Sequence, residues 1–174
     1  MATDTACTAL ASALCARGWM LATAESCTGG MIAAACTDLT GSSQWFERGF
    51  VTYSNAAKTE ALGVDPALLA AHGAVSEAVV RAMVQGALAH SQAQVALAVT
   101  GIAGPSGGTA DKPVGTVWFG WATPDGLHTE CRRWPGDRAQ VRQATRDHAL
   151  QQMNRLLAAV DDPHAAGRAP HLPP

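Results

Sequence analysis

The feature that most constrains the fold is an uninterrupted apolar run near the middle of the chain, AQVALAVTG at residues 93–101. A strand with one face in water alternates apolar and polar side chains, and this run shows no such alternation. A continuous apolar strand is typical of a sheet that helices cover on both faces. The run therefore predicts a buried strand in the sheet of an α/β fold.

Helices and strands alternate on both sides of this run. Further strands are predicted at residues 19–24, 49–53, 114–122 and 127–134, and helices at residues 4–17, 29–39, 55–62, 64–73, 76–91 and 136–160. A turn at Pro124-Asp125-Gly126 would join the last two strands into a hairpin. This order predicts a three-layer α/β/α fold whose sheet is mixed and largely parallel.

Length and composition limit the class of protein. The 174 residues predict one domain at residues 1–160 and a disordered tail at residues 161–174, which hold four of the nine prolines. A net charge of −2 argues against a protein that binds nucleic acid through bulk electrostatics. No apolar run reaches the roughly 18 residues of a membrane span, and residues 1–15 contain no Lys or Arg of a secretory signal. A cytoplasmic protein is expected, with neither nucleic acid nor a membrane as partner, and a homo-oligomer is compatible with the sequence.

The cysteines and histidines show no metal signature. The five cysteines form no CxxC pair, and the six histidines show neither HxxxH nor HExxH spacing. A zinc site, a disulfide framework and a His-based triad are therefore not indicated, and no metal or other cofactor is expected.

Polar residues and glycines collect after three of the predicted strands. The segments are TAESCTGG at residues 23–30, TYSNAAK at residues 52–58 and TGIAGPSGGTADK at residues 100–112. Ligands of open α/β sheets bind at the carboxyl ends of the strands. We therefore expect the three segments to form one site.

The first segment places Ser26 at a turn from strand to helix. Free backbone N–H groups and the positive end of the helix dipole would stabilise the oxyanion that a nucleophilic serine creates there. Gly29 and Gly30 would let a ligand approach the backbone closely. Alternatively, Ser26 or Thr28 simply caps the helix. Cys27 is a rival nucleophile, although a small buried cysteine is common.

The second segment contains Lys58, one of two lysines among twelve basic residues. Lys58 follows Ser26 by 32 residues, about one strand–helix–strand unit, so the two would lie on neighbouring loops. Burial and a place in the first turn of a helix would lower the pKa of Lys58 and provide a neutral amine as base. Alternatively, Lys58 is exposed on a helix face. Tyr53 is expected either to orient Lys58 or a substrate, or to pack.

The third segment is rich in glycine but matches neither GxGxxG nor a Walker loop. Its N–H groups and hydroxyls suit a phosphate or a ribose, and Lys112 would supply a positive charge. The alternative is a tight connection before the hairpin. Across the three segments, the candidate substrate-binding residues are Thr28, Gly29, Gly30, Thr100, Gly101, Gly104, Thr109 and Lys112.

A basic stripe recurs every four residues in the last predicted helix, at Arg138, Arg142 and Arg146. Asp137 and Asp147 are interleaved with the stripe. A solvated helix face is therefore favoured over an anion site, and the stripe ranks second to Lys112 for the phosphate.

Taken together, the motifs resemble one family. They are TAESCTGG, GSSQWFERGFVTYSNAAKTEALGV, HGAVSE, ALAVTGIAGPSGGTADKPVGTVWFGWA and GDRAQVRQAT. They are similar in content and order to the CinA C-terminal domain family, and the likeness runs from about Trp19 to Leu157. Motifs of this length are more specific than any one short pattern.

The resemblance implies a three-layer α/β fold and an activity. Stand-alone members of the family are nicotinamide-nucleotide amidohydrolases, which convert nicotinamide mononucleotide to nicotinate mononucleotide and ammonia in pyridine nucleotide recycling. By this resemblance Ser26 is the nucleophile, Lys58 is the base and Tyr53 lies nearby, with a small molecule as partner. The chain looks like the short form, without the N-terminal domain of longer relatives. Two alternatives stay open: an amidase for another amide such as free nicotinamide, and a non-catalytic nucleotide-binding or regulatory module.

Overall fold

The computed structural model describes residues 2–160, so the predicted tail at residues 161–174 lies outside the described residues. The helices are α1 (Ala2–Arg17), α2 (Met31–Thr37), α3 (Asn55–Leu62), α4 (Pro66–His72), α5 (Glu77–Ala89) and α6 (Arg138–Val160). The strands are β1 (Leu21–Glu25), β2 (Phe46–Val51), β3 (Val95–Gly101), β4 (Thr116–Thr123) and β5 (Gly126–Arg133). Every predicted helix and strand is present, and a short 3₁₀ helix, η1 (Ser42–Gln44), was not predicted. No helix within residues 2–160 is both long and apolar enough to cross a membrane.

The five strands form one sheet in the order β2-β1-β3-β4-β5. Strand β1 pairs in parallel with β2 and β3, whereas β4 pairs antiparallel with β3 and β5. Strand β4 therefore runs against the direction of the other strands, which confirms the predicted mixed and largely parallel sheet.

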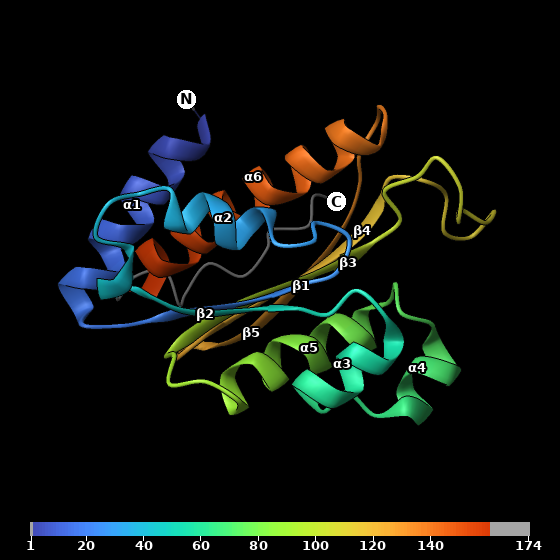
Figure 1. The fold of residues 1–174 in the computed structure, drawn as a ribbon, viewed down its shortest axis with the longest axis horizontal. Helices are drawn as coiled ribbons and strands as arrows, with labels where there is room; N and C mark the ends of the chain where they lie inside the picture. The colour runs from blue at the N-terminus through green and yellow to red at the C-terminus, as the bar shows by residue number, and fades with distance from the viewer. Residues whose placement is uncertain (1, 161–174) are drawn as a thin grey trace, which may run out of the picture.

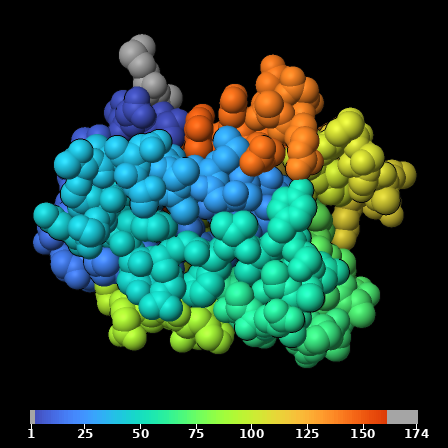
Figure 2. Space-filling model, in the orientation of Figure 1, coloured from blue at the N-terminus to red at the C-terminus, as the bar shows by residue number. Residues whose placement is uncertain are grey.

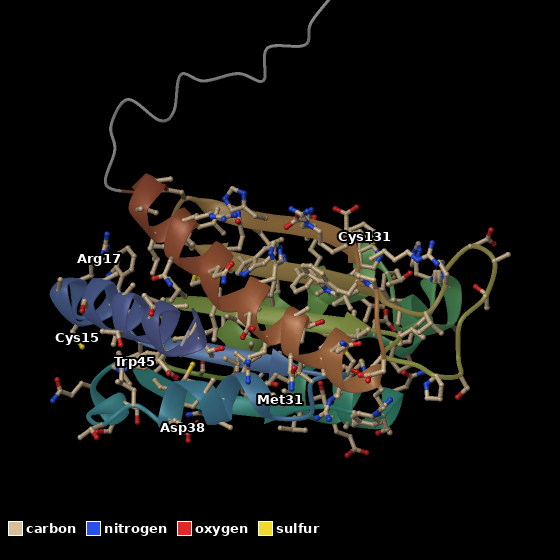
Figure 3. The ribbon with its side chains drawn as sticks, turned by 90° about the horizontal axis from the view of Figure 1, so that it is seen from above. Cys15, Arg17, Met31, Asp38, Trp45 and Cys131 are labelled. Atoms are coloured by element: carbon tan, nitrogen blue, oxygen red, sulfur yellow. The ribbon has the colours of Figure 1, made fainter. Side chains whose placement is uncertain are left out.

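Helices cover both faces of this sheet. Figure 1 shows α1, α2 and α6 on one face and α3, α4 and α5 on the other. Seen from above in Figure 3, helices α1, α2 and α6 lie side by side. Met31, at the start of α2, lies close to the first turns of α6. Strand β3 is therefore buried on both faces, as the apolar run at residues 93–101 predicted.

The two faces of the sheet are packed differently. Strands β1 and β3 place large side chains, such as Leu21 and Leu97, in the core beneath α1, α2 and α6. On the opposite face the same strands present alanines, such as Ala22 and Ala96. Because alanine projects little from the sheet, the apolar side of α5 can lie close to the strands and be fully buried, as Met83 is.

The chain leaves β1 and β2 over opposite faces of the sheet. The connection from β1 to β2 runs through α2, and the connection from β2 to β3 runs through α3, α4 and α5 on the other face. The carboxyl ends of β1, β2 and β3 meet at one edge, where open α/β sheets bind their ligands. The three polar segments of the sequence thus come together at this edge.

The helix after β1 begins later than predicted. The structure places α2 at Met31–Thr37 and not at residues 29–39. Gly29 and Gly30 have φ angles of +59° and +99°, which a right-handed helix excludes and which glycine adopts readily. The chain therefore forms a turn at residues 26–29 before α2, and this turn carries Ser26. We call residues 26–29 the nucleophile turn.

Candidate active site

Ser26 and Lys58 are in direct contact. Ser26 follows the last residue of β1, and Lys58 lies in α3, whose cap Ser54 accepts a hydrogen bond from the N–H of Ala57 at 3.0 Å. Lys58 Nζ lies 3.0 Å from Ser26 Oγ. The exposed fractions are 8% for Ser26 and 1% for Lys58. The alternative of an exposed lysine on a helix face is therefore excluded.

Lys58 Nζ also contacts the carbonyl oxygens of Thr52 at 2.9 Å and Tyr53 at 3.3 Å. Burial of the amine lowers the pKa of Lys58 below its usual value, against a smaller opposing effect of Cys27. A neutral amine has two N–H donors and one lone pair. If the two N–H groups bind the two carbonyls, the lone pair remains for the hydroxyl proton of Ser26. This geometry suits an amine that acts as a base toward a serine.

A cavity of about 280 Å³ opens beside the two side chains. Its wall is formed by residues at and after the ends of β1, β2 and β3, by α3, by the segment before α5 and by the start of α6. In Figure 2 the orange start of α6 and the blue region of α2 lie on the same visible face. The other predicted site residues in the cavity wall are Tyr53, Thr100, Gly101 and Gly104.

The remaining predicted binding residues lie outside the wall of this cavity in the described chain. Lys112 Nζ donates to the carbonyl of His72 at 2.9 Å, and the N–H of Lys112 donates to Thr109 Oγ1 at 3.1 Å. Lys112 thus ties the tip of the glycine-rich loop to the end of α4. Thr28 is fully buried, and an added Cβ at Gly29 would lie 3.6 Å from Arg142.

The N-terminus of α2 is not free, contrary to the expectation from the sequence. Glu25, which is fully buried, accepts hydrogen bonds from the N–H groups of Gly30 and Ile32 at 3.0 Å and of Ala33 at 2.8 Å. The helix therefore binds its own carboxylate, and an oxyanion cannot use these N–H groups. The role of Glu25 was missed, although a carboxylate followed by two glycines, which offer no capping side chain, is a possible signal.

Two N–H groups of the nucleophile turn have no backbone acceptor within the described residues. The N–H of Ser26 donates to the carbonyl of Val99 at 3.1 Å, and the N–H of Gly29 to the carbonyl of Ser26 at 3.1 Å. Within the described residues, the N–H groups of Cys27 and Thr28 donate to no other protein oxygen. Cys27 lines the cavity, so its N–H is the donor of the turn that an oxyanion there can use, whereas Thr28 is fully buried outside the cavity wall.

The thiol of Cys27 does not match the serine as a nucleophile. Burial raises the pKa of Cys27 to about 12, so the thiol is protonated near neutral pH. A thiol attacks as the thiolate. Lys58 contacts the hydroxyl of Ser26, and the neighbouring thiol is 4% exposed. The geometry therefore favours Ser26.

The basic stripe on α6 is only partly a solvated face, because Arg138 is exposed whereas Arg142 and Arg146 are half-buried. Arg138 Nη1 donates to the carbonyl of Gly104 at 3.0 Å, and Nη2 donates to the hydroxyl of Tyr53 at 2.8 Å. Arg142 donates to the carbonyls of Cys27 at 3.1 Å and Thr28 at 2.8 Å. Two arginines of the stripe thus contact the site, and Arg138 lines the cavity.

Tyr53 contributes differently with its backbone and its side chain. Its carbonyl accepts a hydrogen bond from Lys58, whereas its ring is 59% exposed. The hydroxyl is fixed by Arg138, so the ring stands at the mouth of the cavity. This position suits contact with a substrate more than packing in the core.

A second hollow of about 440 Å³ lies between α3 and α4. Its walls are mostly apolar and include Ala56, Pro66 and Leu69. Among its described lining residues, no hydrogen bond joins a hydroxyl to a basic group. The smaller cavity beside Ser26 is therefore the candidate active site.

Comparison with known proteins gives a consistent result. The model of the CinA C-terminal domain matches residues 3–157. A relative from Enterobacter agglomerans, named nicotinamide-nucleotide amidohydrolase PncC, is 58% identical over 134 residues, which are 76% of this chain and 82% of the relative. A relative of the same name from Escherichia coli is 55% identical over 142 residues, or 80% of this chain and 85% of the relative.

A solved structure has the same fold. The competence/damage inducible protein CihA from Agrobacterium tumefaciens superposes with a TM-score of 0.87 at 42% identity. The superposition covers 91% of this chain and 96% of that protein. The likeness therefore extends over most of the fold.

Proposed function

Because the chain belongs to the CinA C-terminal domain family and most of it is similar to nicotinamide-nucleotide amidohydrolases, we propose that it hydrolyses the carboxamide of nicotinamide mononucleotide. The products are nicotinate mononucleotide and ammonia, in the recycling of pyridine nucleotides. The observation that carries the proposal is the buried contact of 3.0 Å between Lys58 Nζ and Ser26 Oγ beside a cavity of small-molecule size. This contact supports an amidase over a non-catalytic binding module.

In the first step, neutral Lys58 accepts the hydroxyl proton of Ser26 while Ser26 Oγ attacks the amide carbon. The carbonyl oxygen becomes an oxyanion, which the N–H of Cys27 at the cavity wall stabilises. Protonated Lys58 then gives its proton to the amide nitrogen. The carbon–nitrogen bond breaks, ammonia leaves, and an acyl ester on Ser26 remains.

In the second step, water hydrolyses the ester. Lys58, neutral again, accepts a proton from water as its oxygen attacks the ester carbon. When the carbon–oxygen bond to Ser26 breaks, Lys58 returns the proton to Ser26 Oγ. The acid product leaves, and the serine and the neutral amine are restored.

The phosphate of the substrate is assigned to Arg138. Its contacts with Gly104 and Tyr53 hold the guanidinium at the cavity wall. A guanidinium has five N–H donors, so donors remain for a phosphate, which binds arginine in a bidentate manner. Lys112, the candidate from the sequence, is bonded to His72 outside the cavity wall.

The direct test is incubation of the purified protein with nicotinamide mononucleotide, with ammonia and the acid product measured. We expect both products in equal amounts, and much lower kcat/KM for free nicotinamide and for nicotinamide riboside, which lack the phosphate. Equal kcat/KM for all three amides would indicate an amidase without a phosphate site. Binding of the mononucleotide without ammonia release would support a non-catalytic module.

Arg138→Ala is expected to raise KM for the mononucleotide about 10- to 100-fold with a small change in kcat. The phosphate is remote from the reacting amide, so its binding is similar in the ground state and the transition state. A hydrogen bond between charged groups contributes about 1.5–3 kcal/mol, which corresponds to this range.

Lys112→Ala is the matched control, measured by steady-state kinetics under the same conditions. It also removes a cation near the site, but one whose ammonium is bonded to the carbonyl of His72. We expect a smaller rise in KM than for Arg138→Ala. An equal or larger rise would place the phosphate at the glycine-rich loop, as the sequence suggested.

A further inference from the structure

We propose that Glu25 and Arg142 are positioning residues for the proposed reaction, which together clamp the nucleophile turn and fix its oxyanion site. Arg142 binds the backbone within the turn, and Glu25, the residue before the turn, binds the backbone directly after it. Glu25 accepts from N–H groups, and Arg142 donates to carbonyl oxygens. The inference rests on the proposed function for its substrate, and its test includes a readout that does not depend on that substrate.

Glu25 fixes where the turn begins and ends. Glu25 is the last residue of β1, directly before the turn. Its carboxylate accepts a hydrogen bond from the N–H of Gly30, the residue that follows the turn. Gly30 is the cap residue of α2 and has no side chain to satisfy the first N–H groups of the helix. Glu25 takes this capping role, and three hydrogen bonds stabilise its buried carboxylate.

Arg142 fixes the orientation of the peptide groups inside the turn. The peptide bonds of the turn are trans, so each carbonyl points away from the N–H of the following residue. Arg142 Nε holds the carbonyl of Cys27 at 3.1 Å, which turns the N–H of Thr28 away from α6. Arg142 Nη2 holds the carbonyl of Thr28 at 2.8 Å, which turns the N–H of Gly29 the same way.

The hydrogen bonds of the turn agree with this orientation. The N–H of Gly29, directed away from Arg142, donates to the carbonyl of Ser26 at 3.1 Å. The N–H of Thr28 has no protein acceptor among the described residues, and Cys27 lines the cavity whereas Arg142 does not. Donors that are already oriented before the reaction stabilise an oxyanion most effectively. The clamp supplies this orientation without touching the substrate.

The test compares Arg142→Met with Arg146→Met, its matched control one turn further along α6. Arg146 contacts Asp147 at 2.8 Å and Thr3 at 3.0 Å, and none of the residues of the nucleophile turn in the described structure. We expect Arg142→Met to lower kcat about 10- to 100-fold with KM changed less than about threefold. Arg146→Met should keep kcat, and thermal melting should show that both variants are folded.

Two further variants keep the test decisive if Arg142→Met does not fold. Arg142→Lys can reach only one of the two carbonyls, so its kcat should fall between wild type and Arg142→Met. Glu25→Gln replaces one acceptor oxygen by an NH₂ donor that faces a backbone N–H, and its kcat should also fall. Asp65→Asn, which weakens the cap on Ala67 of α4, is the matched control for loss of a helix cap.

A second readout is the rate at which a fluorophosphonate reagent labels Ser26, because its phosphoryl oxygen occupies the oxyanion site. Labelling should slow in Arg142→Met and Glu25→Gln but not in the controls, even if the mononucleotide is not the substrate. Equal labelling rates and kcat values in Arg142→Met and Arg146→Met would overturn the inference. A rise in KM alone would also overturn it, since Arg142 would then bind substrate.

Discussion

Ser26→Ala is expected to abolish ammonia release, with kcat lowered by at least about 10³-fold. Ser26 Oγ is the atom that forms the acyl ester in the proposed reaction, and its partner Lys58 Nζ lies 3.0 Å away. The change removes one oxygen beside a cavity and no apolar contact of the core, so the fold should persist. Ammonia release and thermal melting of the purified variant are the measurements.

Cys27→Ala separates the two possible nucleophiles. Because burial raises the pKa of Cys27 to about 12, its thiol is protonated near neutral pH, and the variant should retain most of the activity. Ammonia release at a near wild-type rate by folded Ser26→Ala would remove Ser26 from the mechanism. If Ser26→Ala kept its activity and Cys27→Ala lost it, the thiol would be the nucleophile.

Lys58→Arg is expected to be about as inactive as Lys58→Ala, with kcat lowered by at least about 10²-fold. Arginine keeps the positive charge but does not lose its proton in proteins, so it cannot act as a base. The comparison therefore distinguishes a proton carrier from a fixed charge. If Lys58→Arg kept most of the activity, the lysine would be an electrostatic anchor and the Ser–Lys mechanism would be wrong.

The pH dependence of the wild-type enzyme tests the same residue. Burial lowers the pKa of Lys58, and only the neutral amine can accept the proton of Ser26. The activity, as kcat/KM, should therefore rise with pH through this lowered pKa and level off above it. A profile that falls with rising pH over this range would indicate that the protonated amine is the required form.

Most of the fold follows from local patterns in the sequence. The apolar run that became β3 indicated burial on both faces, and helix α3 spans the predicted residues because Ser54 caps its start and Gly63 ends it. The boundaries of α2 and β2 were less predictable. The start of α2 depends on the backbone of Gly29 and Gly30, whose φ angles a pattern of residue types does not specify.

The site was predictable where it depends on chain order and not where it depends on packing between distant elements. Ser26 and Lys58 follow adjacent parallel strands, so a spacing of one strand–helix–strand unit indicated their contact. The role of the arginines depends on which face of the sheet α6 covers. Asp137, which suggested a solvated face, is exposed and also caps α6 by accepting from the N–H of Gln140 at 2.9 Å.

Residues from both ends of the described chain form the site, and this has a consequence for folding. Ser26 and Lys58 belong to its early part, whereas Arg138 and Arg142 belong to α6, which also packs on α1. Asn154 on α6 donates to the carbonyl of Ala6, 148 residues away, at 2.8 Å. During synthesis the serine and the lysine leave the ribosome long before α6. The contacts of α1 and of the nucleophile turn with α6 therefore form last. Contacts between such distant residues form slowly, and catalytic competence should therefore be among the last properties that a refolding chain regains.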